Sequence, residues 1–436
     1  MTPEAMVAIY CFIGMLVLMT LGLPIYITML VPSIIGLWII GGEPITMTTA
    51  TNASYNITAS YAFAVVPMFL LMGILAGESG MAEGAYKALR NWVSKIRGGL
   101  LMGTIVANAL FGAVSGVTLA SNAVFTKIAL PELDKNGYDR KLSMGCLASA
   151  SVVSVLIPPS IPIVIFAILT DISVGKALVA GIIPGIITTI ALCGVVWLIG
   201  KISPYKVPLA NITTTWREKF SSLTLLGPIL LIFIIIMGGM LAGVFPSTVG
   251  GAVGAFAVII YALARRMGWK MIRNSFREMV LMNASIFVII ISGFVFSRLV
   301  ALSGLSDSLI IWIEQANLSP FLVMSFIMII YIILGAALEE ITILVLTLPV
   351  VFPLLTSLGF DPYAFCIANV LLGQTAGLSP PVGISIFVVA AAANAKASDV
   401  YMGSLPFFIT EIVLIWIFML IPQLSTWLPG LMYSGS

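Results

Sequence analysis

Two apolar stretches of the sequence are each broken near the middle by a pair of prolines. The pairs are Pro158-Pro159 within residues 142–169 and Pro380-Pro381 within residues 365–393. Proline lacks a backbone donor and disfavours helix in the residue before it, so both stretches should unwind and expose free carbonyl oxygens. Such carbonyls, with Ser and Thr hydroxyls, suit Na⁺, whereas the N-termini of half-helices suit an anionic substrate. One proline kink is often only a bend, but two at matched positions favour a site for a cation and an organic anion.

Two further stretches carry small and hydroxylated residues where a membrane helix would be apolar. Residues 98–133 begin and end beside basic residues, so the chain must return to the side it left, and residues 320–355 occupy the equivalent place later in the sequence. Irregular backbone at membrane depth is tolerated only where it is buried in protein or lines a cavity. We therefore predict two re-entrant hairpins, while the alternative that Ser115, Thr118 and Ser121 only let helices pack closely stays open.

The elements that position these residues are predicted to be membrane helices. Of 436 residues, 60% are hydrophobic and 8% are charged, against roughly 25% charged in a soluble domain. Spans of ~20 residues with their connections allow roughly ten to twelve helices. The absence of histidine excludes imidazole metal ligands and a Ser–His catalytic pair, so an intramembrane enzyme is disfavoured. Basic residues lie in short loops, as the positive-inside bias requires, and do not indicate nucleic acid.

The sequence also matches itself at an offset of 222 residues. Pro131 meets Pro353, Gly137-Tyr138-Asp139 meets Gly359-Phe360-Asp361, and the two Pro-Pro pairs coincide. Equivalent segments differ in basic content: 41–61 has no Lys or Arg whereas 265–277 has five, and 87–97 has four whereas 306–317 has none. Because basic residues favour the cytoplasmic side, the halves are predicted to lie in opposite orientations, which is the inverted-repeat layout of alternating-access transporters.

A coarse topology follows from these patterns. Spans are predicted at 5–22, 24–42 and 61–82, with the N-terminus and the polar segment 41–61 outside, and a cytoplasmic interfacial helix at 84–97. The inverted counterparts are 223–243, 246–264, 281–303 and 306–318, and a last span at 402–424 places the C-terminus outside. The fold class predicted is thus an all-α polytopic membrane protein with two hairpins and two interrupted transmembrane helices.

Several runs of residues resemble the large membrane subunit of TRAP (tripartite ATP-independent periplasmic) transporters. They are Phe111-Gly-Ala-Val-Ser-Gly116, Ala129-Leu-Pro-Glu132, Leu156-Ile-Pro-Pro-Ser-Ile-Pro162, Ala180-Gly-Ile-Ile-Pro-Gly185 and Ser379-Pro-Pro-Val-Gly383. The resemblance covers nearly the whole chain. It implies an elevator-type, Na⁺-coupled importer in the bacterial inner membrane. It also implies a small membrane subunit of about four helices and a periplasmic binding protein that delivers an organic acid, such as a C4-dicarboxylate, sialic acid or sugar acid.

The residue pattern and the resemblance together give candidate residues in the hairpin tips and unwound spans. The substrate candidates are Ser115, Gly116, Thr118, Ser160 and Ser379. The Na⁺ candidates are Ser115, Ser154, Pro158, Gly335, Glu339, Thr342, Thr375, Ser379 and Pro380. Na⁺ is expected as the coupling ion and no organic cofactor is implied.

The proposed mechanism divides the chain into fixed and mobile parts. The first repeat is 1–200, with a scaffold at 1–97 and transport elements at 98–170; a cytoplasmic linker follows at 201–222. The second repeat is 223–436, with a scaffold at 223–318 and transport elements at 320–394.

Two features depart from the simplest version of this scheme. Where many relatives have a single Asp in the second hairpin, this chain has Glu339 followed by Glu340. Arg298 lies inside a predicted span, and an intramembrane charge is a functional candidate by default, here for a substrate carboxylate. Because Arg298 is near the outer end of its span, its side chain could equally reach outward to water.

Two rival functions remain open at this stage. A stand-alone Na⁺- or H⁺-coupled dicarboxylate or citrate carrier would share the same repeat logic. A passive channel would show flux unaffected by ion gradients.

Overall fold

The chain folds almost entirely into helices. The structure is a computed structural model and describes residues 2–210, 212 and 214–432. Within these residues, nine helices are long and apolar enough to cross a membrane, or ten if the bent pair Arg140–Leu156 and Ile161–Leu169 is one span. This agrees with the lower limit of the roughly ten to twelve spans expected. An all-helical, multi-span membrane protein is therefore confirmed.

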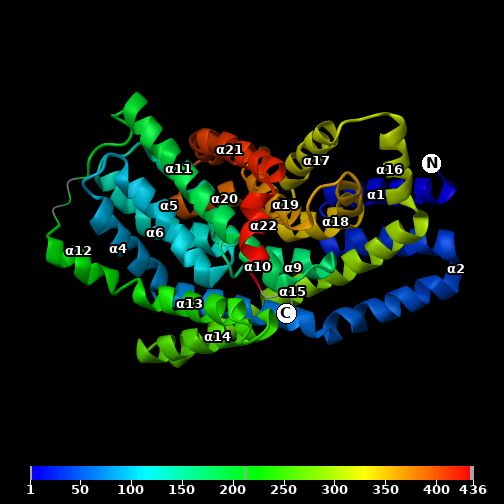
Figure 1. Cartoon of the computed structure of the whole chain (residues 1–436), viewed down its shortest axis with the longest axis horizontal. Helices are drawn as coiled ribbons and strands as arrows, with labels where there is room; N and C mark the ends of the chain where they lie inside the picture. The colour runs from blue at the N-terminus through cyan, green and yellow to red at the C-terminus, as the bar shows by residue number, and fades with distance from the viewer. Residues whose placement is uncertain (1, 211, 213, 433–436) are drawn as a thin grey trace.

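The first half runs from the N-terminus to the end of α11 (Figure 1). Its elements are α1 (Pro3–Thr20), α2 (Ile25–Ala59), η1 (Tyr61–Ala64), α3 (Val65–Glu78), α4 (Met81–Val93), α5 (Gly99–Ser115), α6 (Thr118–Lys135), α7 (Arg140–Ala150), α8 (Val153–Leu156), α9 (Ile161–Leu169), α10 (Val174–Ala180) and α11 (Ile182–Ile202).

The second half repeats this order after a short helix in the linker, α12 (Trp216–Leu223). Its elements are α13 (Gly227–Leu241), α14 (Ser247–Ala264), α15 (Trp269–Ser303), α16 (Leu305–Gln315), α17 (Pro320–Gly335), α18 (Glu340–Ser357), α19 (Pro362–Ala376), α20 (Ile384–Ala393), α21 (Ala397–Leu420) and α22 (Gln423–Gly430). The helix bounds follow the sequence repeat closely, since α6 and α18 begin and end 222 residues apart.

The segment 41–61, predicted as a polar stretch between spans, is instead helical. Helix α2 continues from Ile25 to Ala59, with a kink at Gly42, where φ is 69°. Three threonine hydroxyls in this segment donate to carbonyls four residues earlier: Thr46 to Gly42, Thr48 to Pro44 and Thr58 to Ser54. The backbone at Gly42 is not helical, so α2 consists of two helical stretches that meet there, and the polar side chains of the second stretch bond to its own backbone.

A second predicted span also belongs to a longer helix in the structure. The span predicted at 281–303 belongs to a helix that begins at Trp269, so the basic residues of 265–277 lie partly within α15. In the first half the additional helical residues follow the predicted span, within α2. In the second half the additional helical residues precede the predicted span, within α15. Residues 433–436, the predicted outer C-terminus, lie outside the described residues.

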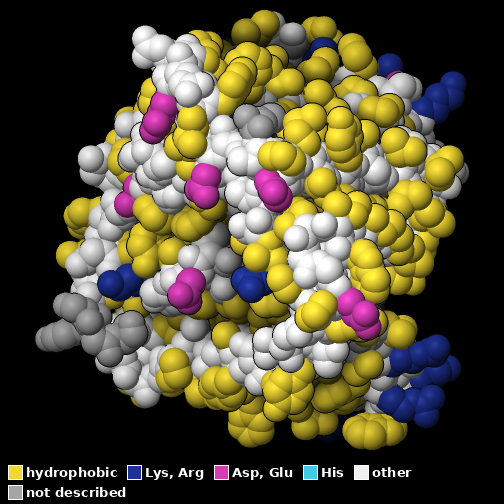
Figure 2. Space-filling model, turned by 90° about the vertical axis from the view of Figure 1, so that its right-hand side faces the viewer, with side chains coloured by type: hydrophobic (Ala, Val, Ile, Leu, Met, Phe, Trp, Pro, Cys, Tyr) yellow, Lys and Arg dark blue, Asp and Glu magenta, His cyan; other side chains and the backbone are white. Residues whose placement is uncertain are grey.

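The first predicted hairpin is largely buried, whereas the second is buried mainly through α18, because α17 exposes large apolar side chains such as Phe326 and Ile333. Helix α5 is buried over most of its length and is joined to α6 by two residues, and α17 and α18 form the matching pair. Helices α1, α2, α14 and α15 also expose many large apolar side chains, among them Tyr10, Ile39, Phe256 and Leu281. Figure 2 shows a face on which hydrophobic side chains are interspersed with single Asp and Glu side chains, while most of the Lys and Arg side chains gather at its right-hand edge. The apolar side chains exposed on the outer helices are suited to lipid.

A very close helix crossing lies between α7 and α21, and it predicts a stability effect. A Cβ at Gly403 would lie 1.8 Å from the Lys141 carbonyl oxygen, and one at Gly145 would lie 2.0 Å from the Gly403 carbonyl carbon. Because the obstacle is backbone, G403A must separate the two helices, and we expect it to lose about 3 kcal/mol or more. Thermal unfolding of the purified protein measures this.

Gly194, in the middle of α11, supplies the matched control. A Cβ there would meet nothing within 4 Å. We expect G194A to change stability by no more than about 1 kcal/mol. Equal unfolding midpoints for G403A and G194A would contradict the close crossing.

Candidate functional site

The tip of the first hairpin lies against the break between α8 and α9. Gly116 joins α5 to α6 with φ of 59°, and a Cβ there would lie 2.4 Å from the Pro159 carbonyl oxygen. One turn earlier, a Cβ at Gly112 would lie 2.4 Å from the Ser154 Cα. Only glycine at these two positions allows the hairpin backbone to approach the broken span so closely.

The break itself has the form that the prolines predict. Helix α8 ends at Leu156, α9 begins at Ile161, and the two parts of the span differ in direction by 49°. The Ser160 hydroxyl caps α9 by accepting the Ile163 N–H at 3.4 Å. The Pro158-Pro159 and Pro380-Pro381 bonds are both cis.

The second hairpin tip is bonded directly to the second break. The N–H groups of Val382 and Gly383 both donate to the Ala336 carbonyl, at 3.1 and 3.2 Å. The Ser379 hydroxyl lies within hydrogen-bond distance of the Ile332 carbonyl at 3.0 Å. A Cβ at Gly335 would lie 2.2 Å from the Ala376 Cβ, so this tip also packs tightly on the end of α19.

Both halves contribute to one cavity of about 290 Å³, here called the central cavity. Its walls come from both hairpin tips, both breaks and two outer helices. The lining residues are Leu70, Gly116, Val117, Thr118, Leu119, Val155, Ile161, Pro162, Leu281, Met282, Ser285, Ile286, Ile289, Leu338, Glu339, Glu340, Ile341, Gly373, Gln374, Gly377, Ile384 and Ser385. No Lys or Arg is among them, whereas two are carboxylates.

The two carboxylates of the cavity differ in their surroundings. Glu339 precedes α18 and its side chain is exposed to the cavity, making no capping hydrogen bond. Glu340 is buried, and its Oε2 accepts a hydrogen bond from the Gln374 side-chain amide. The other oxygen of Glu340 has no protein partner. Glu340 is therefore a buried acceptor with one oxygen free for a cation.

The candidate residues fall into three groups. Gly116, Thr118 and Glu339 line the central cavity. Five others are buried in the tips and breaks around it: Ser115, Ser154, Ser160, Thr342 and Ser379. The hydroxyls of Ser115, Thr118 and Thr342 have no protein partner, whereas the Ser154 hydroxyl donates to the Ser151 carbonyl at 2.6 Å. Three unpartnered hydroxyls beside one cavity are available as cation or substrate ligands.

The remaining candidates are less uniformly placed. Pro158 and Gly335 are buried at the first break and the second tip, but Pro380 is exposed. Thr375 is buried in the last turn of α19 and donates to the Leu371 carbonyl at 2.8 Å. Arg298 is exposed on α15 and does not line the central cavity, so the structure separates it from the other candidates. Its position fits a side chain that reaches outward.

Sequence reasoning did not assign three polar residues of this region to the site. Gln374 and Ser385 line the cavity, and both sit in stretches already marked by proline and glycine. Glu411 is fully buried on α21, and its Oε2 lies 2.9 Å from the Thr375 hydroxyl. The signal for Glu411 was available in the sequence, because a carboxylate within a predicted span is a functional candidate by default.

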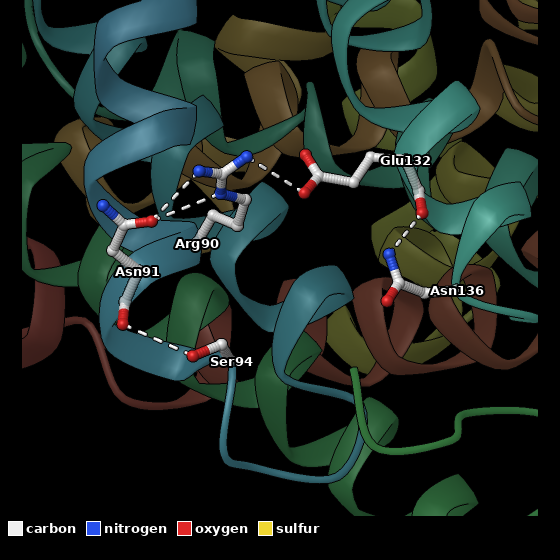
Figure 3. Close-up of polar contacts among 5 residues, drawn as sticks. All are labelled: Arg90, Asn91, Ser94, Glu132 and Asn136. Atoms are coloured by element: carbon white, nitrogen blue, oxygen red, sulfur yellow. Dashed lines mark hydrogen bonds and ion pairs between the residues drawn. The ribbon is translucent and has the colours of Figure 1, made fainter. Parts of the chain in front are cut away.

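Helix α4 is linked to the first hairpin at the end remote from the cavity (Figure 3). Arg90 on α4 pairs with Glu132 on α6 at 3.1 Å, and two other Arg90 nitrogens donate to the Asn91 side-chain oxygen. The Asn136 side-chain amide donates to the Glu132 carbonyl at 2.8 Å, at the C-terminus of α6. Both members of the ion pair are partly buried, so the contact joins α4 to the hairpin more firmly than a fully exposed pair would.

Comparison with known proteins gives one family. Residues 12–424 match the model of the family described as "Tripartite ATP-independent periplasmic transporter, DctM component". The C4-dicarboxylate TRAP transporter large permease protein DctM of Pseudomonas aeruginosa is 28% identical, over 86% of this chain and 88% of that protein. The ectoine TRAP transporter large permease protein TeaC of Halomonas elongata is 27% identical, over 96% of this chain and 98% of that protein. The sialic acid TRAP transporter large permease protein SiaM of Vibrio cholerae is 27% identical, over 85% and 87%.

Two solved structures share the fold. The YdaH transporter of Alcanivorax borkumensis superposes with a TM-score of 0.61 at 14% sequence identity, over 90% of each chain. MtrF of Neisseria gonorrhoeae superposes with a TM-score of 0.56 at 14% identity, over 88% of this chain and 86% of that one. At this identity the likeness concerns the fold alone.

Proposed function

This chain belongs to the DctM family of tripartite ATP-independent periplasmic transporters, and we propose that it imports a small organic acid together with Na⁺ by an elevator mechanism. It is a multi-pass transporter protein of the bacterial inner membrane and not an enzyme. The observation that carries the proposal is the central cavity, whose walls combine both hairpin tips, both proline breaks and two outer helices.

The substrate class follows from the cavity and the relatives. Relatives of similar identity are named for C4-dicarboxylates, sialic acid and ectoine. A cavity of about 290 Å³ suits a molecule of this size, and Thr118 and Ser385 offer hydroxyls that can donate to a carboxylate. Ser115, Gly116, Ser160 and Ser379 are the further substrate residues proposed; Arg298 is no longer among them because it lies outside the cavity.

Cations must enter the site if an anion is to bind there. When ionised, Glu339 and Glu340 give the cavity negative charge, and no basic lining residue offsets it. A carboxylate substrate would be repelled in such a poorly solvated space until a cation neutralises the two acids. We infer that Na⁺ binds before the substrate, which couples the two. Ser115, Ser154 and Pro158 are proposed ligands in the first half, and Gly335, Glu339, Thr342, Thr375, Ser379 and Pro380 in the second, where the structure adds Glu340.

The elevator part of the proposal assigns fixed and mobile elements. Residues 98–170 and 320–394 would form the mobile unit, as two re-entrant hairpins and two interrupted spans, while 1–97 and 223–318 form the scaffold. The central cavity supports this division, because α3 and α15 supply its outer wall and the hairpin tips supply its inner wall. Under this division the Arg90–Glu132 ion pair crosses from scaffold to mobile unit.

Two protein partners are proposed with the permease. The isethionate TRAP transporter permease protein DctMQ of Oleidesulfovibrio alaskensis is matched over 85% of this chain but only 58% of its own length. The remainder of that protein leaves room for a small membrane subunit, here expected as a separate chain of about four helices. A periplasmic binding protein would deliver the organic acid. Lipid covers the apolar outer helices, and no nucleic acid is expected.

Uptake by the reconstituted three-component system tests the function. In proteoliposomes we expect labelled organic acid to accumulate when Na⁺ is outside, because each net positive charge moved inward gains ~2.3 kcal/mol per 100 mV. Replacing Na⁺ by K⁺ should abolish accumulation. Equal uptake in K⁺ without an imposed proton gradient would contradict Na⁺ coupling, and full uptake without the binding protein would favour a stand-alone carrier.

A further inference from the structure

The structure contains a second buried carboxylate that the central cavity does not use. Among the acidic residues of the described chain only Glu340 and Glu411 are buried, and Glu411 is 0% exposed. Glu411 lies in the middle of α21, which packs against α7, α19 and α11. It is not among the lining residues of the central cavity. Its role therefore has to be sought in its own surroundings.

The contacts of Glu411 leave half of its carboxylate free. Oε2 lies 2.9 Å from the Thr375 hydroxyl, and Oε1 has no protein partner. The ion pairs in the described residues are Arg90–Glu132, Arg140–Asp134 and Lys141–Asp399, so none neutralises Glu411. An ionised carboxylate in such a position is strongly unfavourable unless a positive charge joins it.

The Thr375 hydroxyl next to Glu411 could be a second ligand for a cation. Thr375 has a single hydroxyl hydrogen, and the Leu371 carbonyl lies 2.8 Å from its oxygen. This hydrogen can be donated either to Leu371 or to Glu411 Oε2, and when it goes to Leu371 the Thr375 oxygen is free to accept a cation beside Glu411. Thr375 also lies in the last turn of α19, and the C-terminal end of a helix attracts cations.

Comparison of the two halves shows that the carboxylate and the hydroxyl are paired in the second half only. At the offset of 222 residues Glu411 corresponds to Thr189, whose hydroxyl donates to the Gly185 carbonyl at 2.7 Å. Thr375 corresponds to Val153, which has no side-chain oxygen. The first half therefore has neither the carboxylate nor the hydroxyl.

We propose that Glu411 and Thr375 bind one Na⁺ between α19 and α21, in the second half only. The inference rests on the proposed Na⁺ coupling and adds a carboxylate ligand from α21, outside the hairpins and broken spans. Because the bound ion would hold the end of α19 next to the second break, it would connect cation binding to the shape of the central cavity.

Sodium-dependent stabilisation of the purified full-length protein tests the site. The unfolding temperature is measured against NaCl concentration, with choline chloride keeping the ionic strength constant, since a ligand of the folded state stabilises it by mass action. We expect E411Q to require at least about tenfold more Na⁺ than wild type for the same stabilisation. T375V should also require more Na⁺ than wild type for the same stabilisation. It tests the site if the E411Q protein cannot be produced in folded form.

The control is T410V, next to Glu411 on the same helix. The Thr410 hydroxyl donates to the Pro406 carbonyl at 2.9 Å and has no part in the proposed site. We expect T410V to respond to Na⁺ as wild type does. An unshifted response in E411Q would overturn the site and indicate that Glu411 carries a proton, which the neutral amide mimics.

The outcome can be separated from that of the proposed function. Wild-type uptake that depends on Na⁺, together with an unshifted E411Q, contradicts only the Glu411 site. Wild-type uptake that is equal in Na⁺ and K⁺ contradicts the coupling, whatever the stabilisation shows.

Discussion

Replacing Gly116 with alanine is expected to lower Na⁺-driven uptake by at least about tenfold. The backbone at Gly116 has φ of 59°, where a residue with a Cβ loses roughly 1–2 kcal/mol. The new Cβ would also lie 2.4 Å from the Pro159 carbonyl oxygen. Since that obstacle is backbone, the hairpin tip must move away from the break, and the wall of the central cavity moves with it. Initial rates of uptake in proteoliposomes measure the effect.

Gly137 separates the two causes of this loss. It has φ of 74°, but a Cβ there would meet nothing within 4 Å. G137A therefore carries the conformational penalty without the clash, and we expect its uptake to stay within about twofold of wild type. Similar losses in G116A and G137A would show that close packing of the tip on the break is unimportant.

The breaks and the hairpin positions could be predicted because single residues determine them locally. A Pro-Pro pair removes two donors from any helix, whatever surrounds it. The structure accordingly ends α8 at Leu156 and begins α9 at Ile161, and it leaves a longer gap between Ala376 and Ile384 in the second half. The match of α6 to α18 likewise follows from a repeat that is visible in the sequence.

The polar segment 41–61 was not assigned a helix from the sequence. The predicted span end at residue 42 coincides with the break at Gly42, but a second helical stretch follows it, in which Thr46 donates its hydroxyl to the Gly42 carbonyl. Thr46, Thr49, Ala53 and Ile57 are buried at helical spacing, so packing against the rest of the chain favours a helix. Composition alone does not report such burial.

The pairing of side chains across the site could not be predicted. Glu411 and Thr375 are 36 residues apart, and no local pattern indicates that α21 presents one to the other. Nor does the sequence say which of two adjacent glutamates points inward. Neighbouring residues on a helix lie on different faces, so the outcome depends on how the tip meets α19.

The structure resolves that choice and predicts that Glu340 has the greater effect on Na⁺ coupling. Glu340 is buried, accepts a hydrogen bond from Gln374, and keeps one oxygen without a protein partner, whereas Glu339 is exposed to the cavity. Removing the charge with E340Q should raise the Na⁺ concentration for half-maximal uptake by at least about tenfold, equivalent to about 1.4 kcal/mol. Uptake as a function of Na⁺ at fixed substrate measures this shift.

E339Q is the matched control, because it makes the same chemical change at the adjacent position. Glu339 is exposed whereas Glu340 is enclosed by protein, so the charge of Glu339 contributes less to holding a cation, and we expect a shift of less than about threefold. The carboxylates also repel an anionic substrate. Either substitution should therefore increase the small uptake that remains without Na⁺, and E340Q should increase it more, since a buried charge is less screened. A larger effect of E339Q in both measurements would mean that the exposed acid is the principal ligand.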